Sequence, residues 1–244
     1  MSRVAFAERA VYLGAYDALV VADTHVGRAE ASAVSFPLGE REDLVDRLTR
    51  LLSRFDPETL VVAGDVVHTF DRVSDRSRDA LDAIRETCEA NGTALELVAG
   101  NHDTTLPNAW DGPVHEAVVL DPEDTAAPDA RRTVVCHGHE RPSIPAERYV
   151  IGHVHPTIEI EGARHPCFLR GDGVYRAGDL LVLPAFTRLA PGVVVNGMRT
   201  AAFASPLVTD ADRLAPIVYD AGSGDSVGRE PLRFPPLGEC RGLL

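Results

Sequence analysis

Five short polar clusters contain most of the residues in this sequence that could carry out chemistry. They read D-T-H from Asp23, G-D at 64–65, G-N-H-D from Gly100, H-G-H from His137 and G-H-V-H from Gly152. Six of the nine histidines lie in these clusters. A lone histidine after a strand is more often structural than a ligand, but five such clusters together indicate a metal centre. Imidazole, carboxylate and amide donors without thiolate favour manganese, iron or zinc over calcium or copper(I).

The spacing inside the clusters predicts how they bind a cation. In D-x-H and H-x-H, residues at i and i+2 of an extended segment point the same way. We therefore expect the pair Asp23 and His25, and the pair His153 and His155, each to grip one cation from one side. Glycines that allow a sharp turn and a close backbone approach precede three of the clustered polar residues, at positions 64, 100 and 152.

Each cluster stands where a strand is expected to end. Continuous apolar runs typical of strands buried on both faces occur at 18–22 (ALVVA), 59–63 (TLVVA) and 94–99 (ALELVA). Helical spacing of apolar residues fills the intervals, over 44–55 before Pro57 and over 79–90. The order is β-α-β-α-β, and strand ends at one edge of such a sheet meet at one crevice. Clusters that are distant in the sequence can therefore converge.

The second half of the chain changes character and contains little helical periodicity. Its strand-like runs lie near 114–120, 133–136, 149–151, 157–161, 180–183 and 217–219. The linker-like stretch at 121–130 and the glycine-rich tail after residue 220 are interpreted as surface loops. We therefore expect residues 1–244 to form a single domain.

Composition indicates an acidic protein that contains no lysine. The chain has 37 acidic and 24 basic residues, a formal charge of −13, and every basic residue other than histidine is an arginine. An acidic surface of this kind suits a salt-rich cytosol, where charge is screened over a few ångströms. GC-rich codon usage is an alternative that explains the missing lysine but not the excess acid. Because salt screens both repulsion and attraction, net charge does not decide whether the substrate is a nucleic acid.

The four cysteines are far apart and form no C-x-x-C motif, which argues against a disulfide framework or a thiolate zinc site. The first residues lack the apolar core of a signal peptide. No apolar run reaches the roughly 18 residues that a membrane span requires. We expect reduced thiols, no membrane association and a cytoplasmic location.

The ordered series of clusters resembles the calcineurin-like metallophosphoesterase superfamily, and it runs from residue 23 to 155, a little over half of the chain. The resemblance implies an α/β fold, a four-layer α-β-β-α sandwich with two mixed sheets. It also implies two divalent cations, with manganese favoured and iron, zinc or nickel as alternatives. By position in the motifs, one cation would be held by Asp23, His25 and His155 and the other by Asn101, His137 and His153, with Asp65 bridging them.

The resemblance further implies the catalytic residues and the reaction. His102 would be the catalytic histidine facing phosphate and leaving group, and Asp103 would tune it. A hydroxide held between two cations would attack the phosphate ester in line, and His102 would stabilise developing charge or protonate the leaving alkoxide. The expected function is metal-dependent phosphodiester hydrolysis of nucleotides or nucleic acid, as in a nuclease. The alternatives are a phosphomonoesterase acting on small molecules or proteins and a non-catalytic scaffold, although a scaffold would have lost ligands that are all present here.

Later motifs resemble one branch of that superfamily. They are G-D-V-V-H ending at His68, P-C-F-L at 166–169 and L-V-L-P-A-F at 181–186. They look like the ICC-like bacterial and archaeal phosphoesterases, which include the DNA-ligase-associated enzymes. The resemblance therefore implies an association with DNA-repair enzymes and, with the lysine-free composition, a halophilic archaeal member.

Three further residues have two interpretations each. His139 either contacts substrate or hydrogen-bonds a backbone carbonyl, and His68 is either a supporting hydrogen-bond partner or a direct ligand, the ligand set being complete without it. Arg28 either meets a substrate phosphate or forms a surface ion pair, the commoner role for one arginine among 24. Cys136 is expected to be a packed small group rather than a nucleophile, and residues 183–186 (LPAF) a core strand and turn rather than a substrate gate.

Overall fold

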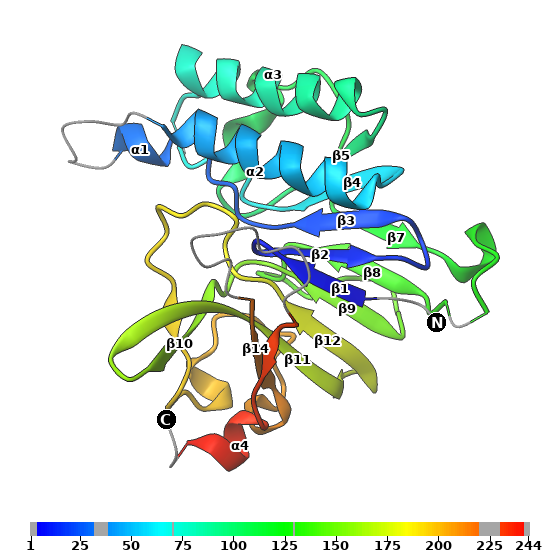
Figure 1. The fold of residues 1–244 in the computed structure, drawn as a ribbon, viewed down its shortest axis with the longest axis vertical. Helices are drawn as coiled ribbons and strands as arrows, with labels where there is room; N and C mark the ends of the chain where they lie inside the picture. Colours follow the sequence, from blue (N-terminus) through cyan, green and yellow to red (C-terminus); the bar gives the residue numbers. More distant parts are fainter. Residues whose placement is uncertain (1–3, 32–38, 70, 129, 220–229, 242–244) are drawn as a thin grey trace.

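The computed structural model describes residues 4–31, 39–69, 71–128, 130–219 and 230–241. Two β-sheets lie face to face, and the long helices α2 (Glu40–Phe55) and α3 (Asp75–Ala90) cover the outer face of the first sheet (Figure 1). Both sheets contain parallel and antiparallel neighbours. The expectation of an α/β fold with two mixed sheets is confirmed.

The first sheet contains six strands in the order of the sequence. They are β1 (Val4–Ala7), β2 (Ala10–Leu13), β3 (Ala18–Val21), β4 (Thr59–Ala63), β5 (Ala94–Val98) and β6 (Val114–His115). Strands β3 to β6 run parallel, while β1 and β2 form antiparallel hairpins that lead into β3. The sequence predicted β3, β4 and β5 almost to the residue but did not predict β1 and β2.

The second sheet contains nine strands, of which β12, β9 and β8 run parallel to one another. Its path is β13 (Val193–Val194), β10 (Pro156–Ile160), β11 (Ala163–Tyr175), β12 (Gly178–Val182), β9 (Arg148–Ile151), β8 (Thr133–Cys136) and β7 (Ala117–Leu120), with β14 (Ala215–Val218) pairing with β11 and with β15 (Leu232–Arg233). The longest of these is β11, where the sequence contains the P-C-F-L motif but did not predict a strand. The outer face of this sheet is covered by short segments, among them α4 (Leu237–Cys240) and the 3₁₀ turns Thr200–Ala202 and Ala211–Arg213.

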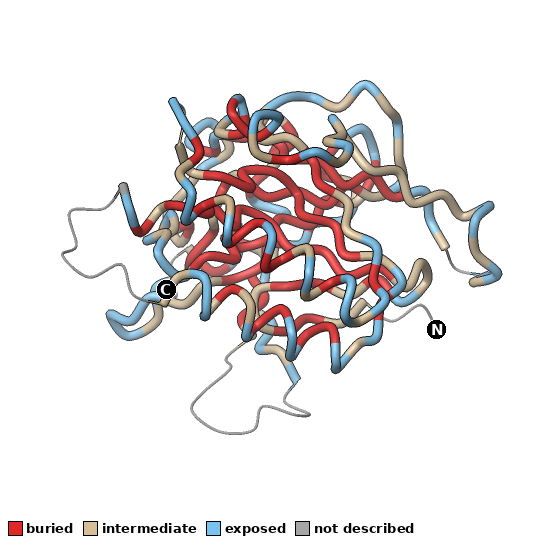
Figure 2. The backbone as a smooth tube through the Cα atoms, turned by 90° about the horizontal axis from the view of Figure 1, so that it is seen from above, coloured by how far each residue is buried: buried red, intermediate tan, exposed pale blue. Residues whose placement is uncertain are grey.

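Three layers of buried apolar side chains hold the sandwich together, and the buried residues, red in Figure 2, are concentrated in the interior of the molecule. In β3, Leu19 and Val21 face the helices, whereas Val20 and Ala22 just beyond it face the other sheet. Phe6 and Phe168 meet across the sheets with ring centroids 4.7 Å apart. Because both faces of the central strands are covered, their sequences read as continuous apolar runs.

The connections place polar residues at one edge of both sheets. Helix α3 begins at Ser74, whose hydroxyl accepts a hydrogen bond from the Ser77 N–H as an N-cap. In the predicted loop at 121–130, the described residues form no strand and one 3₁₀ turn, Pro122–Asp124. Of the tail after residue 220, the part at 220–229 lies outside the described residues, and the part at 230–241 forms β15 and α4 with Leu237 and Cys240 buried, so the prediction of a surface loop was wrong there. No helix in the described part of the chain is long and apolar enough to cross a membrane.

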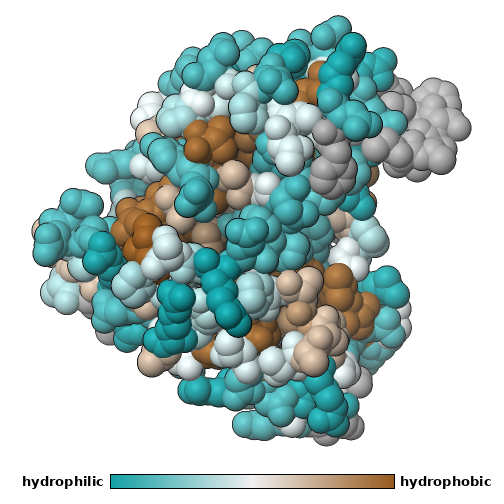
Figure 3. Space-filling model, turned by 180° about the vertical axis from the view of Figure 1, so that it is seen from behind, coloured by the Kyte–Doolittle hydropathy of each residue, from teal (hydrophilic) through white to brown (hydrophobic). Residues whose placement is uncertain are grey.

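One face of the molecule is mainly hydrophilic, with separate small apolar patches (Figure 3).

Candidate metal centre

The clusters after β3 and β4 lie side by side because the parallel pairing continues beyond the two strands. The His25 N–H donates to the Asp65 carbonyl (2.9 Å) and the Val26 N–H donates to the Val66 carbonyl (2.8 Å). An isolated bridge then joins Val26 to Val67. This paired extension carries Asp65 to the side of His25.

Five of the seven expected ligand positions have a left-handed backbone. Their φ angles are 56° at Asp23, 44° at His25, 47° at Asp65, 67° at His153 and 50° at His155. This conformation costs a residue with a Cβ about 1–2 kcal/mol, and it persists only where the surrounding structure enforces it. The expectation that these segments are extended was wrong. Tight left-handed turns, rather than alternation along a strand, aim the side chains inward.

The side chains form two donor groups that share one residue. The first donor group consists of Asp23, His25, Asp65 and His155, and the second donor group of Asp65, His137 and His153, with the candidate ligand atoms in each within 4.8 Å of one another. Asn101 joins the second group, because its Oδ1 lies 3.0 Å from the His137 Nε2. His153 and His155 fall into different groups, so the prediction that this pair grips one cation was wrong. Asp65 belongs to both groups.

Glycines allow the loops to approach this closely. A Cβ on Gly64 would lie 2.4 Å from the His137 Nδ1, and one on Gly100 would lie 2.2 Å from the Asp65 Oδ1. A Cβ on Gly152 would lie 2.5 Å from the Asp23 Oδ2. All three distances are far below an ordinary carbon contact. These glycines therefore allow a close approach between the loops themselves, and the predicted close approach to a ligand stays a prediction.

The electrostatics of the two groups suit a bound cation. Burial, together with the nearby charge of Asp23, raises the pKa of Asp65 to about 7. Burial lowers the pKa of His25 to about 3 and that of His137 to about 4, although Asp23 opposes both shifts. At neutral pH these imidazoles are therefore uncharged, with a lone pair available to a metal.

Ring nitrogens of neighbouring histidines also face one another, and hydrogen bonds between the rings cannot pair all of these nitrogens. The Nε2 atoms of His25 and His155 are 3.4 Å apart, and the His153 Nδ1 lies 3.1 Å from the His137 Nε2. Burial lowers the pKa values of His137 and His153, and two neutral rings placed in this way can share only one hydrogen. Buried carboxylates and converging imidazoles are ligands of divalent transition metals, so the residues present fit a pair of cations.

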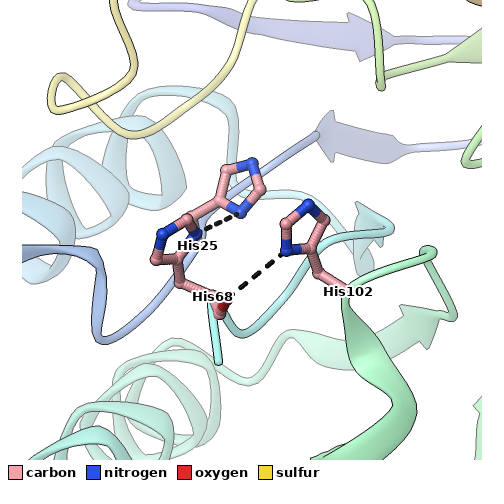
Figure 4. Close-up of side chains that lie close together, drawn as sticks. All are labelled: His25, His68 and His102. Atoms are coloured by element: carbon pink, nitrogen blue, oxygen red, sulfur yellow. Dashed lines mark hydrogen bonds between the residues drawn. The ribbon is translucent and has the colours of Figure 1, made fainter. Parts of the chain in front are cut away.

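The loop after β5 brings His102 to the same edge (Figure 4). Its backbone N–H donates to the Asp65 Oδ1 (2.9 Å), and its ring lies edge-on to His25 with centroids 5.1 Å apart. The His102 Nδ1 is 3.4 Å from the carbonyl oxygen of His68, which leaves Nε2 directed toward Asp65, at 3.9 Å from its Oδ2. The side chain is 23% exposed, so a substrate can reach it.

Asp103 fastens this loop to its neighbour. Its carboxylate accepts hydrogen bonds from the backbone N–H groups of Val66 (3.1 Å), Val67 (2.9 Å) and Gly100 (2.8 Å). Burial raises the pKa of Asp103 to about 6, although these three hydrogen bonds oppose the shift. The contacts connect the loop after β4 to the loop after β5, and so fix Asp65 relative to His102.

A family model described as calcineurin-like phosphoesterase matches residues 17–186, which include every residue of both donor groups. The chain belongs to this family. It is a metal-dependent phosphoesterase, a hydrolase of phosphate esters.

Two solved structures are similar to this calcineurin-like phosphoesterase. A nuclease, MPE, from Pseudomonas putida is 26% identical with a TM-score of 0.57, over 86% of this chain and 88% of that one. Yfce, a phosphoesterase from E. coli, is 14% identical with a TM-score of 0.45, over 89% of this chain and 98% of that one. No curated protein matches the sequence significantly.

In this phosphoesterase, His68 and Arg28 flank the first donor group. The His68 Nδ1 lies 3.5 Å from the His25 Nδ1, and its ring stacks on that of His102 with centroids 5.6 Å apart. His25, His68 and His102 could themselves hold an ion, so both predicted roles of His68 remain open. The Arg28 Nε donates to the Leu189 carbonyl (3.3 Å). Within the described residues its guanidinium forms no ion pair, although the sequence favoured a surface ion pair for this arginine.

His139 lies beside the second donor group of the phosphoesterase. Its ring centroid is 5.2 Å from that of His137 and 6.1 Å from that of His153. Its Nδ1 is buried and has no hydrogen-bond partner among the described residues, so the backbone-carbonyl bond considered from the sequence is not formed there. Contact with substrate is the interpretation that this position favours.

Of two expectations about core residues, the one for Cys136 is confirmed and the one for residues 183–186 is confirmed for burial alone. Cys136 is 5% exposed and packs in the apolar layer outside the second sheet. Residues 183–186 are buried as expected, but β12 ends at Val182 and these residues form no strand. The Phe186 N–H donates to the Ala22 carbonyl (2.7 Å) beside the site. No sequence pattern indicated that the following residue, Thr187, also reaches the site, where its N–H donates to the Asp23 carbonyl (3.3 Å).

Proposed function

We propose that the phosphoesterase holds two divalent cations, with Asp65 between them. The observation that supports this assignment is that Asp65 belongs to both donor groups. The cation of the first group would be held by Asp23, His25 and His155, and that of the second by Asn101, His137 and His153. Such cations would supply the Lewis acidity and the activation of water that phosphate ester hydrolysis requires.

The residues around the cations supply the rest of the chemistry. With its Nδ1 held at the His68 carbonyl, His102 presents Nε2 to the reacting phosphate, where it delivers a proton to the leaving oxygen. Asp103 keeps the His102 loop in place through its three backbone contacts. The Arg28 guanidinium donates a hydrogen bond to the Leu189 carbonyl. Burial lowers the pKa values of His68 and His102, and the positive charge of Arg28 lowers them further. We assign Arg28 to the non-bridging oxygens of the phosphate.

We further propose that the substrate is a phosphodiester of a nucleotide or a nucleic acid. The similar structure from Pseudomonas putida is a nuclease, and a positive Arg28 beside the first donor group suits a phosphate chain. Manganese is the proposed metal, because the donors are nitrogen and oxygen without thiolate.

An activity panel tests this function. The purified protein is given manganese in high salt and is offered a phosphomonoester, a phosphodiester and single-stranded DNA. Hydrolysis of the diester and the DNA at rates well above the monoester is expected. Hydrolysis of the monoester alone would overturn the proposed substrate class.

Three broader assignments are proposals as well. We propose that residues 1–244 are one domain, because the two sheets share a common core. We propose membership of the ICC-like branch and a salt-rich cytoplasm, on the later motifs and on the charge of −13 without lysine. If the last proposal holds, added potassium chloride should raise the thermal stability of the protein rather than lower it.

A further inference from the structure

A cleft of about 610 Å³ opens beside the second donor group. Its walls come from the end of β5, from β6 and β7, from the end of β8 and from the loop at 137–144. His137 lies in the wall, so the cleft begins directly at the proposed metal centre. The sequence singled out some of its residues, among them His137 and His139, but did not predict a cleft here.

The cleft has the size and the surface of a site for a small organic group. Ligand pockets in proteins commonly measure about 300–1,000 Å³ and combine apolar walls with a few polar groups. Here apolar surface comes from Ala99, Ala117, Pro142 and Ile144. The buried Nδ1 of His139, which lacks a partner among the described residues, supplies a polar contact beside the second donor group.

The charges around the cleft disfavour a second phosphate. His115 is paired with Glu96 at 2.7 Å and contributes no free positive charge. Glu116 and Glu140 are exposed in the lining, against a single arginine, Arg141, and the Glu140 Oε1 lies 3.9 Å from the His139 Nε2. The lining is therefore negative on balance, whereas the opposite flank of the site carries Arg28.

We propose that this cleft holds an uncharged nucleoside arm of the phosphodiester substrate, which in DNA is a terminal nucleoside without a further phosphate. The proposal rests on the phosphodiesterase function proposed above and adds the position and the chemical class of one arm. The base lies against the apolar wall, His139 hydrogen-bonds the sugar or the base, and the phosphate lies at the donor groups. A second phosphate on the same arm is rejected by Glu116 and Glu140.

The kinetic test compares three diesters with the same p-nitrophenol leaving group. Their other arm is a methyl group, a thymidine attached through its 5′ oxygen, or the same thymidine carrying an additional 3′-phosphate. The wild-type protein is expected to prefer thymidine to methyl by about tenfold or more in kcat/KM, the usual effect of filling a specific pocket. The additional phosphate should remove that preference.

Two variants fill the cleft from different sides, Ser143→Trp from the loop and Ala117→Leu from β7. Both should bring the thymidine preference, the ratio of kcat/KM on the thymidine diester to kcat/KM on the methyl diester, close to one. Ser53→Trp, which places the same side chain on the exposed face of α2, is the matched control and should retain the preference. A preference that survives both cleft variants, or a gain from the additional phosphate, overturns the proposal.

A binding measurement separates this proposal from the proposed activity. Saturation-transfer NMR with thymidine on metal-free protein needs no turnover, and wild type and Ser53→Trp should bind whereas Ser143→Trp should not. If the wild type hydrolyses no diester but binds thymidine in this pattern, the proposed function fails and the cleft assignment stands. If it hydrolyses the methyl diester but shows neither thymidine binding nor thymidine preference, the cleft assignment fails alone.

Discussion

Replacing Gly100 by alanine should disable the centre although glycine and alanine differ by one methyl group. The added Cβ would lie 2.2 Å from both the backbone nitrogen and the Oδ1 of Asp65. Ordinary contact begins near 3.4 Å, so the loop or Asp65 must move by roughly 1 Å. Asp65 serves both donor groups, and its displacement therefore affects two cations together.

The magnitude follows from that displacement. A misplacement of about 1 Å in a catalytic arrangement can reduce turnover by roughly 10²-fold. Forcing a methyl group into a packed site costs about 1–3 kcal/mol of folding free energy, which is a fraction of the usual stability of a domain. We therefore expect a folded Gly100→Ala protein that holds less metal and turns over an activated diester about a hundredfold more slowly.

Gly197→Ala is the matched control, because a Cβ at Gly197 has nothing within 4 Å. Neither glycine has a φ in the left-handed region, so backbone strain does not differ between the two substitutions. Metal content, turnover and thermal unfolding are measured for both variants. Equal metal content and equal turnover in the two variants would refute the close approach of the Gly100 loop to Asp65.

Further predictions concern the residues around the centre and the core. His102→Ala should retain both metals while turnover falls by roughly 10²–10⁴, with a larger loss on a nucleotide diester than on an aryl ester whose leaving group needs no proton; an equal loss on both would make His102 a phosphate-binding group. Asp103→Ala leaves three N–H groups without their acceptor and should lower the free energy of unfolding by more than about 3 kcal/mol. Asp103→Asn can keep the two hydrogen bonds made to Oδ2, so its free energy of unfolding should fall by less in the same denaturant titration. All four cysteines are free and buried, and burial raises the pKa of Cys88 and Cys136 to about 12. A thiol reagent at pH 8 should therefore label none of them in the native protein and all four after unfolding. Rapid labelling of the native protein would contradict the packing.

The central strands were predictable because both of their faces are buried. Residues 59–63 and 133–136 read as continuous apolar runs, and the structure places β4 and β8 at these bounds. In contrast, β11 alternates buried residues with exposed ones such as Arg170 and Asp172, and its register shifts, so no continuous run marks it. Strands β1 and β2 are four residues each and are joined by a tight turn, too short for a clear pattern.

The residues of the site were predictable, but the way in which they meet was not. The motifs and the spatial order of parallel strand ends indicated which side chains converge. The left-handed backbone at His153 and His155 was not apparent, since these residues adopt it only under tertiary constraint. For the same reason the spacing argument assigned this pair to one cation, whereas the family motifs assigned His155 and His153 to different cations, as in the two donor groups.

The role of Asp103 likewise became visible only in three dimensions. The sequence placed it next to His102, which suggested a direct effect on that imidazole. Its carboxylate accepts bonds from the amides of Val66 and Val67, which lie in another loop, and a pairing of this kind has no sequence signal. The contact of Arg28 with the Leu189 carbonyl likewise has no sequence signal, because the two residues are 161 positions apart in the chain.

The most direct test of a two-metal centre around Asp65 is the metal content of Asp65→Asn. Protein loaded with manganese and then dialysed is analysed for bound metal, with Asp172→Asn, an exposed carboxylate, as the control. Wild type and Asp172→Asn should retain two metals per chain. Asp65→Asn should lose both together, because the shared carboxylate supplies negative charge to both donor groups. Retention of two tightly bound metals by Asp65→Asn would contradict the shared position of Asp65.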